Sequence, residues 1–137
     1  RHPRALVIGS DQVCLAGERV LGKPGSVDAA RAQLASLSGQ QAVFATALCV
    51  VDGGGQREFA GCVDTTVDFL DLDPARIARY VEREQPLDCA GSFKVEGLGI
   101  SLFESVRSDD PTALVGLPLI LLCRFLRASG IEPLAAA

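Results

Sequence analysis

The feature that most constrains the fold is a hairpin pattern between residues 42 and 70. The run AVFATALCVV (42–51) is rich in β-branched and aromatic residues, and the DGGG that follows is a strong hairpin signal. The returning segment, about 57–70, alternates two sets of side chains: Val63, Thr65, Val67 and Phe69 on one face, Asp64, Thr66 and Asp68 on the other. The pattern therefore predicts two antiparallel strands with one buried and one solvated face.

Shorter elements are predicted on both sides of this hairpin. ALVIG indicates a buried strand, which the polar step SDQ interrupts before VCLA, and AGER indicates a tight turn with Gly17 at positive φ. GISLFESV (99–106) indicates a further strand. Helices are expected over 27–37, 74–84 and about 118–129, because capping residues bound apolar residues at helical spacing. This mixture predicts the α/β class, with a mixed sheet and flanking helices.

The composition is that of an ordered globular domain. The 137 residues are 48% hydrophobic and 22% charged, which fits a single domain over 1–137. The net charge of −4 argues against a nucleic-acid partner. No stretch reaches the ~20 apolar residues of a membrane span, since Arg124 interrupts GLPLILLCRFL, so no membrane partner is expected.

The five cysteines are scattered and show no CxxC spacing. Buried free thiols are favoured over a metal site or disulfides, and a reducing, cytoplasmic location follows.

The chain opens on RHPRALVIGS, without a methionine or a signal peptide, and runs directly into a strand. It is therefore expected to be the remainder of a longer protein whose beginning is missing.

Lys94 and Glu96 stand out in the segment GSFKVEGLGISLFE (91–104). If this segment is extended, both side chains leave the same face, because strand side chains alternate with period two. A surface ion pair contributing ~0–1 kcal/mol is the simpler interpretation. The three glycines of the segment weigh against it, because glycine is costly in a strand unless something must approach the backbone.

Two further charged residues lie where the backbone changes course. Asp11, in VIGSDQV, is a carboxylate at the end of an inner strand, and it either serves a functional site or caps a turn or pairs with a lysine. Lys23, in GKPGS, precedes a helix whose first N–H groups are free. That combination makes an anion site, although a solvated turn lysine is the simpler interpretation.

The acidic loop SDDP also has two interpretations. Asp109 and Asp110 suit a metal, but polar turns next to a proline are common, and the turn is favoured. The single histidine, His2, lies at the start, and no Ser/His/Asp or Cys/His set can be assembled. The remaining carboxylates, lysines and glycines suit metal-assisted attack of water on a phosphate.

Five segments in order resemble the Maf family of nucleoside triphosphate pyrophosphatases: IGSDQV, LGKP, LSG, YVEREQPLDCAGSFKVEGLGISLFE and LVGLPL. The resemblance runs from about residue 6 to residue 134. The segments SDQV and GSFKVEG are similar to the corresponding segments of the subgroup that hydrolyses 7-methyl-GTP. The subgroup that acts on dTTP and UTP is expected to carry Thr at position 12 and Gln at position 96.

The resemblance implies a two-lobed fold shared with inosine-triphosphatase-like enzymes. It implies hydrolysis between the α- and β-phosphates, which gives a monophosphate and pyrophosphate with a divalent Mg or Mn. Asp11 matches the catalytic carboxylate, as proton acceptor or metal ligand, Gln12 and Glu96 match specificity positions, and Lys23 and Lys94 match lysines that we assign to phosphates. The implied role is removal of modified nucleotides from the pool, and a homodimer is suggested by the resemblance alone.

The resemblance also implies a physical role for the carboxylate of Glu96. N7-methylguanine carries a positive charge and offers N1–H and N2–H donors, so a carboxylate accepts both bonds and balances the charge. We expect Asp11 to face Lys94 and Glu96 across a groove shaped for a purine triphosphate.

One departure from the family pattern bears on activity. Family members begin with a Ser-x-Ser-x-x-Arg segment that this sequence does not contain, so weak or absent turnover is expected of these residues alone. Two alternatives stay open: a dTTP and UTP pyrophosphatase of the same family, and a non-catalytic nucleotide-binding module linked to septum formation.

Overall fold

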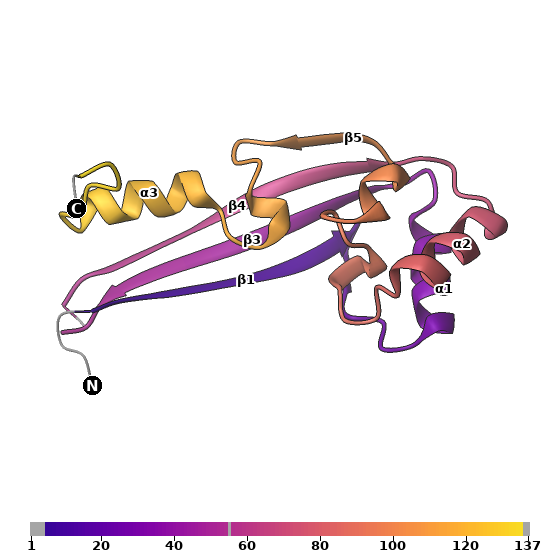
Figure 1. Ribbon diagram of the computed structural model, residues 1–137, viewed down its shortest axis with the longest axis horizontal. Helices are drawn as coiled ribbons and strands as arrows, with labels where there is room; N and C mark the ends of the chain where they lie inside the picture. Colours follow the sequence, from indigo (N-terminus) through magenta and orange to yellow (C-terminus); the bar gives the residue numbers. More distant parts are fainter. Residues whose placement is uncertain (1–4, 55, 136–137) are drawn as a thin grey trace.

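The computed structural model describes residues 5–54 and 56–135, which form one sheet with helices gathered at its two ends (Figure 1). The strands are β1 (Leu6–Ala16), β2 (Arg19–Leu21), β3 (Gln41–Asp52), β4 (Glu58–Phe69) and β5 (Phe103–Ser108). The helices are α1 (Val27–Leu37), α2 (Pro74–Glu84) and α3 (Leu119–Ala128). Three short 3-10 helices complete the set: η1 (Ala90–Ser92), η2 (Leu98–Leu102) and η3 (Ala113–Val115).

The predicted hairpin is the centre of the sheet. β3 and β4 pair antiparallel, from Gln41 opposite Asp68 to Val51 opposite Glu58. Thr65, Val67 and Phe69 are buried and Val63 is half-buried, whereas on the other face Asp64 is exposed and Thr66 and Asp68 are half-buried. The prediction of one buried face and one solvated face is therefore confirmed.

The predicted α/β class is confirmed, but the mixed sheet is not found in the described residues. The sheet order is β2-β1-β3-β4-β5, and every pair of neighbours runs antiparallel. A parallel pair needs a connection that crosses from one end of the sheet to the other. Here α1 and α2 each return the chain at the end where the preceding strand stops (Figure 1), so the next long strand reverses direction.

The helices begin where the sequence predicts. The Ser26 side chain accepts a hydrogen bond from the Ala29 N–H at the start of α1, and Asp73 accepts one from the Arg76 N–H at the start of α2. Each cap satisfies an N–H group that the first helical turn leaves without a partner.

Two predicted strand boundaries are wrong. β1 continues through the polar step, because Asp11 and Gln12 keep their ladder partners in β3. In the segment 99–106 only the second half is a strand, and residues 98–102 form η2. The Gly99 N–H donates to the Lys94 carbonyl over 3.0 Å, which closes a turn where an extended strand was expected.

The core divides into two apolar clusters. The larger lies at the α1 and α2 end and includes Phe44, Phe69 and Phe93. The smaller joins Leu48 and Val50 of β3 to Leu122 of α3 at the other end. This division agrees with the two-lobed arrangement that the resemblance implies.

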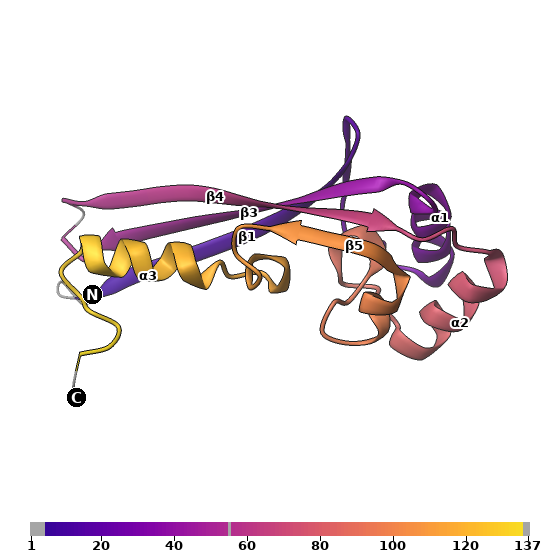
Figure 2. The ribbon, with the colours of Figure 1, turned by 90° about the horizontal axis from the view of Figure 1, so that it is seen from above.

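The two faces of the sheet are covered unequally (Figure 2). α3 and the 3-10 helices lie on one side, and the opposite side carries no helix in the described part of the chain. Val7 and Val13 of β1 lie on that open side and are 61% and 41% exposed.

The five cysteines are free, as predicted, although they are not all buried. Burial raises the pKa of the Cys14 thiol to about 12, which keeps it protonated and inert. Cys62, by contrast, is exposed.

None of the helices in residues 5–54 and 56–135 combines the length and hydropathy needed to cross a bilayer.

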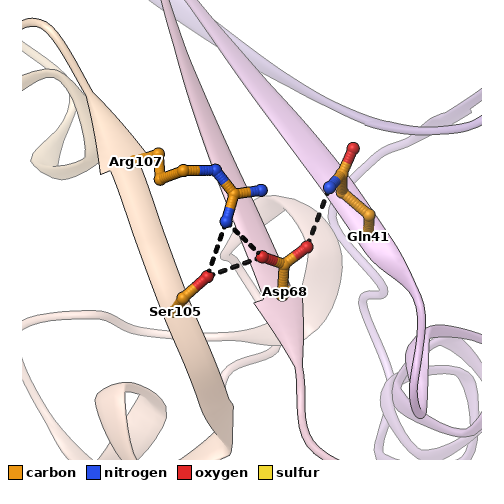
Figure 3. A network of polar contacts seen from close by, with 4 residues as sticks. All are labelled: Gln41, Asp68, Ser105 and Arg107. Carbon is orange, nitrogen blue, oxygen red and sulfur yellow. Dashed lines mark hydrogen bonds and ion pairs between the residues drawn. The ribbon is translucent and has the colours of Figure 1, made fainter.

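A polar network on the open face fastens the edge strand β5 to the sheet (Figure 3). The Asp68 carboxylate accepts hydrogen bonds from Gln41 Nε2 at 2.8 Å, from Arg107 Nη1 at 2.6 Å and from the Ser105 hydroxyl. Arg107 first, then Ser105 and Gln41, hold the pKa of Asp68 well below its usual range. Because the charged form is favoured in the folded state, the network stabilises the fold only while Asp68 is ionised.

We therefore predict that Asp68→Asn lowers stability in a pH-dependent manner. A carboxyl whose pKa is depressed by folding contributes fully above its unfolded pKa of about 3.9, and its contribution is lost as pH falls through the folded value. Urea unfolding at pH 7 and at pH 2 should show a gap between wild type and D68N that shrinks in acid. Asp109→Asn, at an exposed position, is the matched control. A gap that is equal at both pH values would reject this role.

Candidate functional site

A hollow of about 130 Å³ brings together three of the predicted site residues. Gln12 comes from β1, and Lys94 and Glu96 come from the turn between η1 and η2. Leu114 and Val115 of η3 line the same hollow, as does Phe93. Residues more than 80 positions apart in the sequence thus share one concave surface, which is where small-molecule sites usually form.

The turn that carries Lys94 and Glu96 is held on both sides. The Phe93 ring is buried against Phe44, with ring centroids 4.7 Å apart and nearly perpendicular planes. The Lys94 N–H donates to the Tyr80 hydroxyl over 2.8 Å. Burial raises the pKa of Tyr80, so the phenol that accepts this bond stays neutral. The side chain of residue 94 therefore starts from a fixed backbone position.

Glycine at position 99 is required by the turn itself. A Cβ atom built on Gly99 would overlap the Lys94 backbone carbonyl, which accepts from the Gly97 and Gly99 N–H groups. The expectation that something approaches the backbone here is correct, but in this structure the approaching group belongs to the same chain.

Lys94 and Glu96 share the hollow even though they do not lie on a strand. Both side chains are exposed, and neither forms an ion pair with a residue of the described part of the chain. The simpler interpretation as a surface ion pair therefore fails. Both charges are free to meet a ligand with a negative part and a positive or donor-rich part.

Gln12 is held in one orientation by three acceptors. Its Nε2 donates to the Thr46 hydroxyl at 2.8 Å and to the Ala113 carbonyl at 2.9 Å, with the Leu114 carbonyl at 3.3 Å. The network joins β1, β3 and η3 around the floor of the hollow.

Asp11 does not face Lys94 and Glu96, so the expected groove between them is a wrong prediction. Asp11 and Gln12 are successive residues of a regular strand, opposite Ala47 and Thr46 of β3, and their side chains leave opposite faces of the sheet. Asp11 lies on the open face, beside Ala47 and Cys49, with its Oδ1 accepting from the Gln12 N–H. It is exposed rather than enclosed.

Lys23 is not one of the residues that line the hollow. The Gly25 N–H donates to the Leu87 carbonyl over 2.9 Å, which ties the lysine's loop to the loop ahead of η1. Burial and then Asp88 raise the pKa of the Cys89 thiol, and the positive charges of Lys94 and Lys23 oppose that rise. Because Cys89 lines the hollow, both cations act on the same small region.

The acidic loop is a turn and cap, which confirms the favoured interpretation of Asp110. Its carboxylate accepts from the N–H groups of Thr112 and Ile120, and from the Thr112 hydroxyl. Burial raises the pKa of Asp110, but these hydrogen bonds outweigh it and lower the pKa. Asp110 thus fixes η3 against the start of α3, and with it the carbonyls that hold Gln12.

The described residues provide few side-chain ligands for a metal ion. No group of three or more His, Cys, Asp or Glu side chains that could hold a metal is found in the described residues. Asp11 is an exposed carboxylate with one oxygen uncommitted within residues 5–54 and 56–135. A single carboxylate suits a magnesium-like ion that takes most of its ligands from phosphates and water.

Sequence reasoning missed Thr46 and the carbonyls of Ala113 and Leu114. Thr46 looks like one more β-branched residue of an apolar strand, and backbone carbonyls carry no residue-type signal. Only the register of β1 against β3 and the fold of η3 reveal that all three meet Gln12.

Comparison with known proteins agrees with the motifs. The family model described as Maf-like protein matches residues 1–129. A 7-methyl-GTP pyrophosphatase of Alkalilimnicola ehrlichii is 58% identical over 130 residues, which cover 95% of this chain and 65% of that protein. One of Chromohalobacter salexigens is 51% identical over 133 residues, 97% of this chain and 69% of that protein. One of Alcanivorax borkumensis is 52% identical over 132 residues, 96% of this chain and 67% of that protein. The chain spans about two thirds of the length of these relatives, from 65% to 69%.

We predict that Gly99→Ala destabilises the turn that carries Lys94 and Glu96. The overlap with the Lys94 carbonyl forces a backbone shift, which we expect to cost about 1–3 kcal/mol of unfolding free energy. Gly22→Ala is the control, because a methyl group there would meet no heavy atom within 4 Å and the φ of Gly22 is not in the left-handed range. Urea unfolding should separate the two variants, and equal stability would contradict the role of Gly99.

Proposed function

The chain belongs to the Maf-like protein family, and from this premise we propose that it acts as a pyrophosphatase on 7-methyl-GTP. The products would be 7-methyl-GMP and pyrophosphate. Relatives at 51% to 58% identity carry the name 7-methyl-GTP pyrophosphatase, which supports the substrate class. The observation that carries the proposal is the meeting of Gln12, Lys94 and Glu96 around one hollow.

The hollow suits the methylated base. The base is cationic and presents two N–H donors, so the exposed Glu96 carboxylate can accept both bonds and balance the charge. The amide oxygen of Gln12 adds a neutral acceptor in the same hollow. Acceptors therefore match the donor-rich edge of guanine.

The phosphates of the bound nucleotide would extend from the hollow past the side chains of two lysines. Lys94 lines it, and Lys23 acts on the same region from the loop that precedes α1. The first N–H groups of an α-helix attract anions, so the start of α1 supports Lys23 in this role.

The open edge of β1 gives the phosphates a path to Asp11. β2 pairs with β1 only at residues 14–16, so the edge beside Asp11 and Gln12 has no strand neighbour in the described part of the chain. The two residues are adjacent, with Cα atoms about 3.8 Å apart. A nucleotide with its base against Gln12 can thus extend over the edge to the carboxylate on the other face.

At that edge Asp11 would act as a general base. The oxygen of water bonds to a phosphorus of the α–β anhydride, the bridging bond of that phosphorus breaks, and the water proton passes to the carboxylate. A divalent Mg or Mn, held by the phosphates with Asp11 as a protein ligand, would neutralise phosphate charge. One Asp11 oxygen accepts from the Gln12 N–H, and the other is uncommitted among the described residues, so either task would fall to that second oxygen.

We predict that Glu96→Gln weakens binding of 7-methyl-GMP about tenfold, because a charged hydrogen-bond acceptor is replaced by a neutral one. Binding of UMP should change less than about twofold, because uracil carries no positive charge for the carboxylate to balance. Calorimetric titration measures both affinities without requiring turnover. Glu104→Gln, an exposed carboxylate on β5, is the control. Tighter binding of UMP than of 7-methyl-GMP by wild type would favour the dTTP and UTP alternative.

We predict that Asp11→Asn reduces pyrophosphate release at least about 100-fold, because a positioned general base contributes that much or more. Asparagine keeps an oxygen for the Gln12 N–H, so the strand should be undisturbed. Single-turnover assays with excess protein detect slow hydrolysis of 7-methyl-GTP. Hydrolysis at the same rate in wild type and D11N would contradict this role of Asp11, and binding of 7-methyl-GMP that D11N leaves unchanged, with no turnover to lose, would favour the non-catalytic module.

A further inference from the structure

The orientation of the Gln12 amide is fixed by chemistry as well as by geometry. Backbone carbonyl oxygens only accept hydrogen bonds, so the amide end that meets the Ala113 and Leu114 carbonyls must be the NH₂ group. The reverse orientation would set the Gln12 oxygen against two other oxygens. The amide oxygen is therefore the end left for a ligand.

The Gln12 oxygen is accessible from solvent. It accepts no hydrogen bond from residues 5–54 and 56–135, and no buried side-chain nitrogen or oxygen in those residues lacks a partner. An oxygen with neither a partner nor complete burial must reach the surface. In a residue that lines the hollow, this oxygen is available to a bound base.

Thr46 is the buried residue whose side chain contacts the Gln12 amide. It lies directly opposite Gln12 in the register of β1 and β3 and is fully buried. Its hydroxyl donates to the Ala113 carbonyl over 2.9 Å, so its lone pairs are left to accept from Gln12 Nε2 at 2.8 Å. One hydroxyl thus fixes both the amide and the η3 carbonyl that the amide also meets.

We propose that Thr46 is a positioning residue for base selection, which acts by locking Gln12 with its oxygen toward the nucleobase. The inference rests on the proposed function of the hollow. An amide locked as an acceptor favours the N1–H and N2–H edge of guanine. It disfavours uracil and thymine, whose single N3–H lies between two carbonyl oxygens that would oppose the Gln12 oxygen.

Thr46→Val is the informative substitution, because valine keeps the shape of threonine and lacks the hydroxyl. Gln12 then loses one of its three acceptors, and the Ala113 carbonyl loses the Thr46 donor, so the amide is held less firmly when a carbonyl-bearing base approaches. We expect the preference for 7-methyl-GMP over UMP, measured as a ratio of dissociation constants, to fall about three- to tenfold. This change corresponds to the free energy that one hydrogen bond contributes. Thr46→Ser restores the hydroxyl and should restore the ratio.

Thr65→Val is the matched control. Thr65 is also fully buried, on the same face of the sheet, but its hydroxyl donates to the Ser108 hydroxyl and does not touch Gln12. A purely structural effect would lower the melting temperature of both valine variants and leave both ratios at the wild-type value. A positioning role for Thr46 requires the ratio to fall in T46V alone.

The outcomes separate this inference from the function on which it rests. If wild type prefers 7-methyl-GMP and T46V keeps that preference, the role of Thr46 is overturned and the proposed function stands. If wild type binds neither nucleotide, or binds both equally, the proposed function fails and the inference fails with it.

Discussion

The pairing of β1 with β3 decides which side chains share the hollow. In a regular strand the side chains alternate between the faces, so a register that sets Gln12 opposite Thr46 also turns Asp11 to the other side. A shift of one residue would exchange the two roles. The proposed division of labour, with base selection on the covered face and proton transfer at the open face, therefore depends on this one ladder.

The same face of the sheet also supports the turn on the other side of the hollow. Phe44, two residues before Thr46 on β3, packs edge-to-face against Phe93, which directly precedes Lys94. Phe93 also meets Phe103 at the start of β5, with ring centroids 4.9 Å apart. Buried aromatic contacts thus fix the backbone from which two exposed charges extend, so the hollow is preorganised by the core beneath it.

Periodicity in the sequence predicts most of the elements, and it fails where tertiary contacts override local pattern. The hairpin, the three helices and the cap at Ser26 follow from side-chain spacing and capping chemistry. The apolar residues of η2 resemble a strand, whereas the turn is imposed by hydrogen bonds to the Lys94 carbonyl. Motif resemblance identifies Lys94, Glu96 and Gln12, but the side of the sheet that Asp11 occupies requires the register, and Thr46 has no signature in sequence.

A methylated guanine base is proposed to occupy the hollow between Gln12 and Glu96. The most direct measurement is a nuclear magnetic resonance titration of the isotope-labelled chain with 7-methyl-GMP. We expect saturable shifts of the Gln12 side-chain amide and of the backbone amides at 94–96. Saturable shifts confined to a distant surface, such as the outer side of α2, with those signals unmoved, would contradict it.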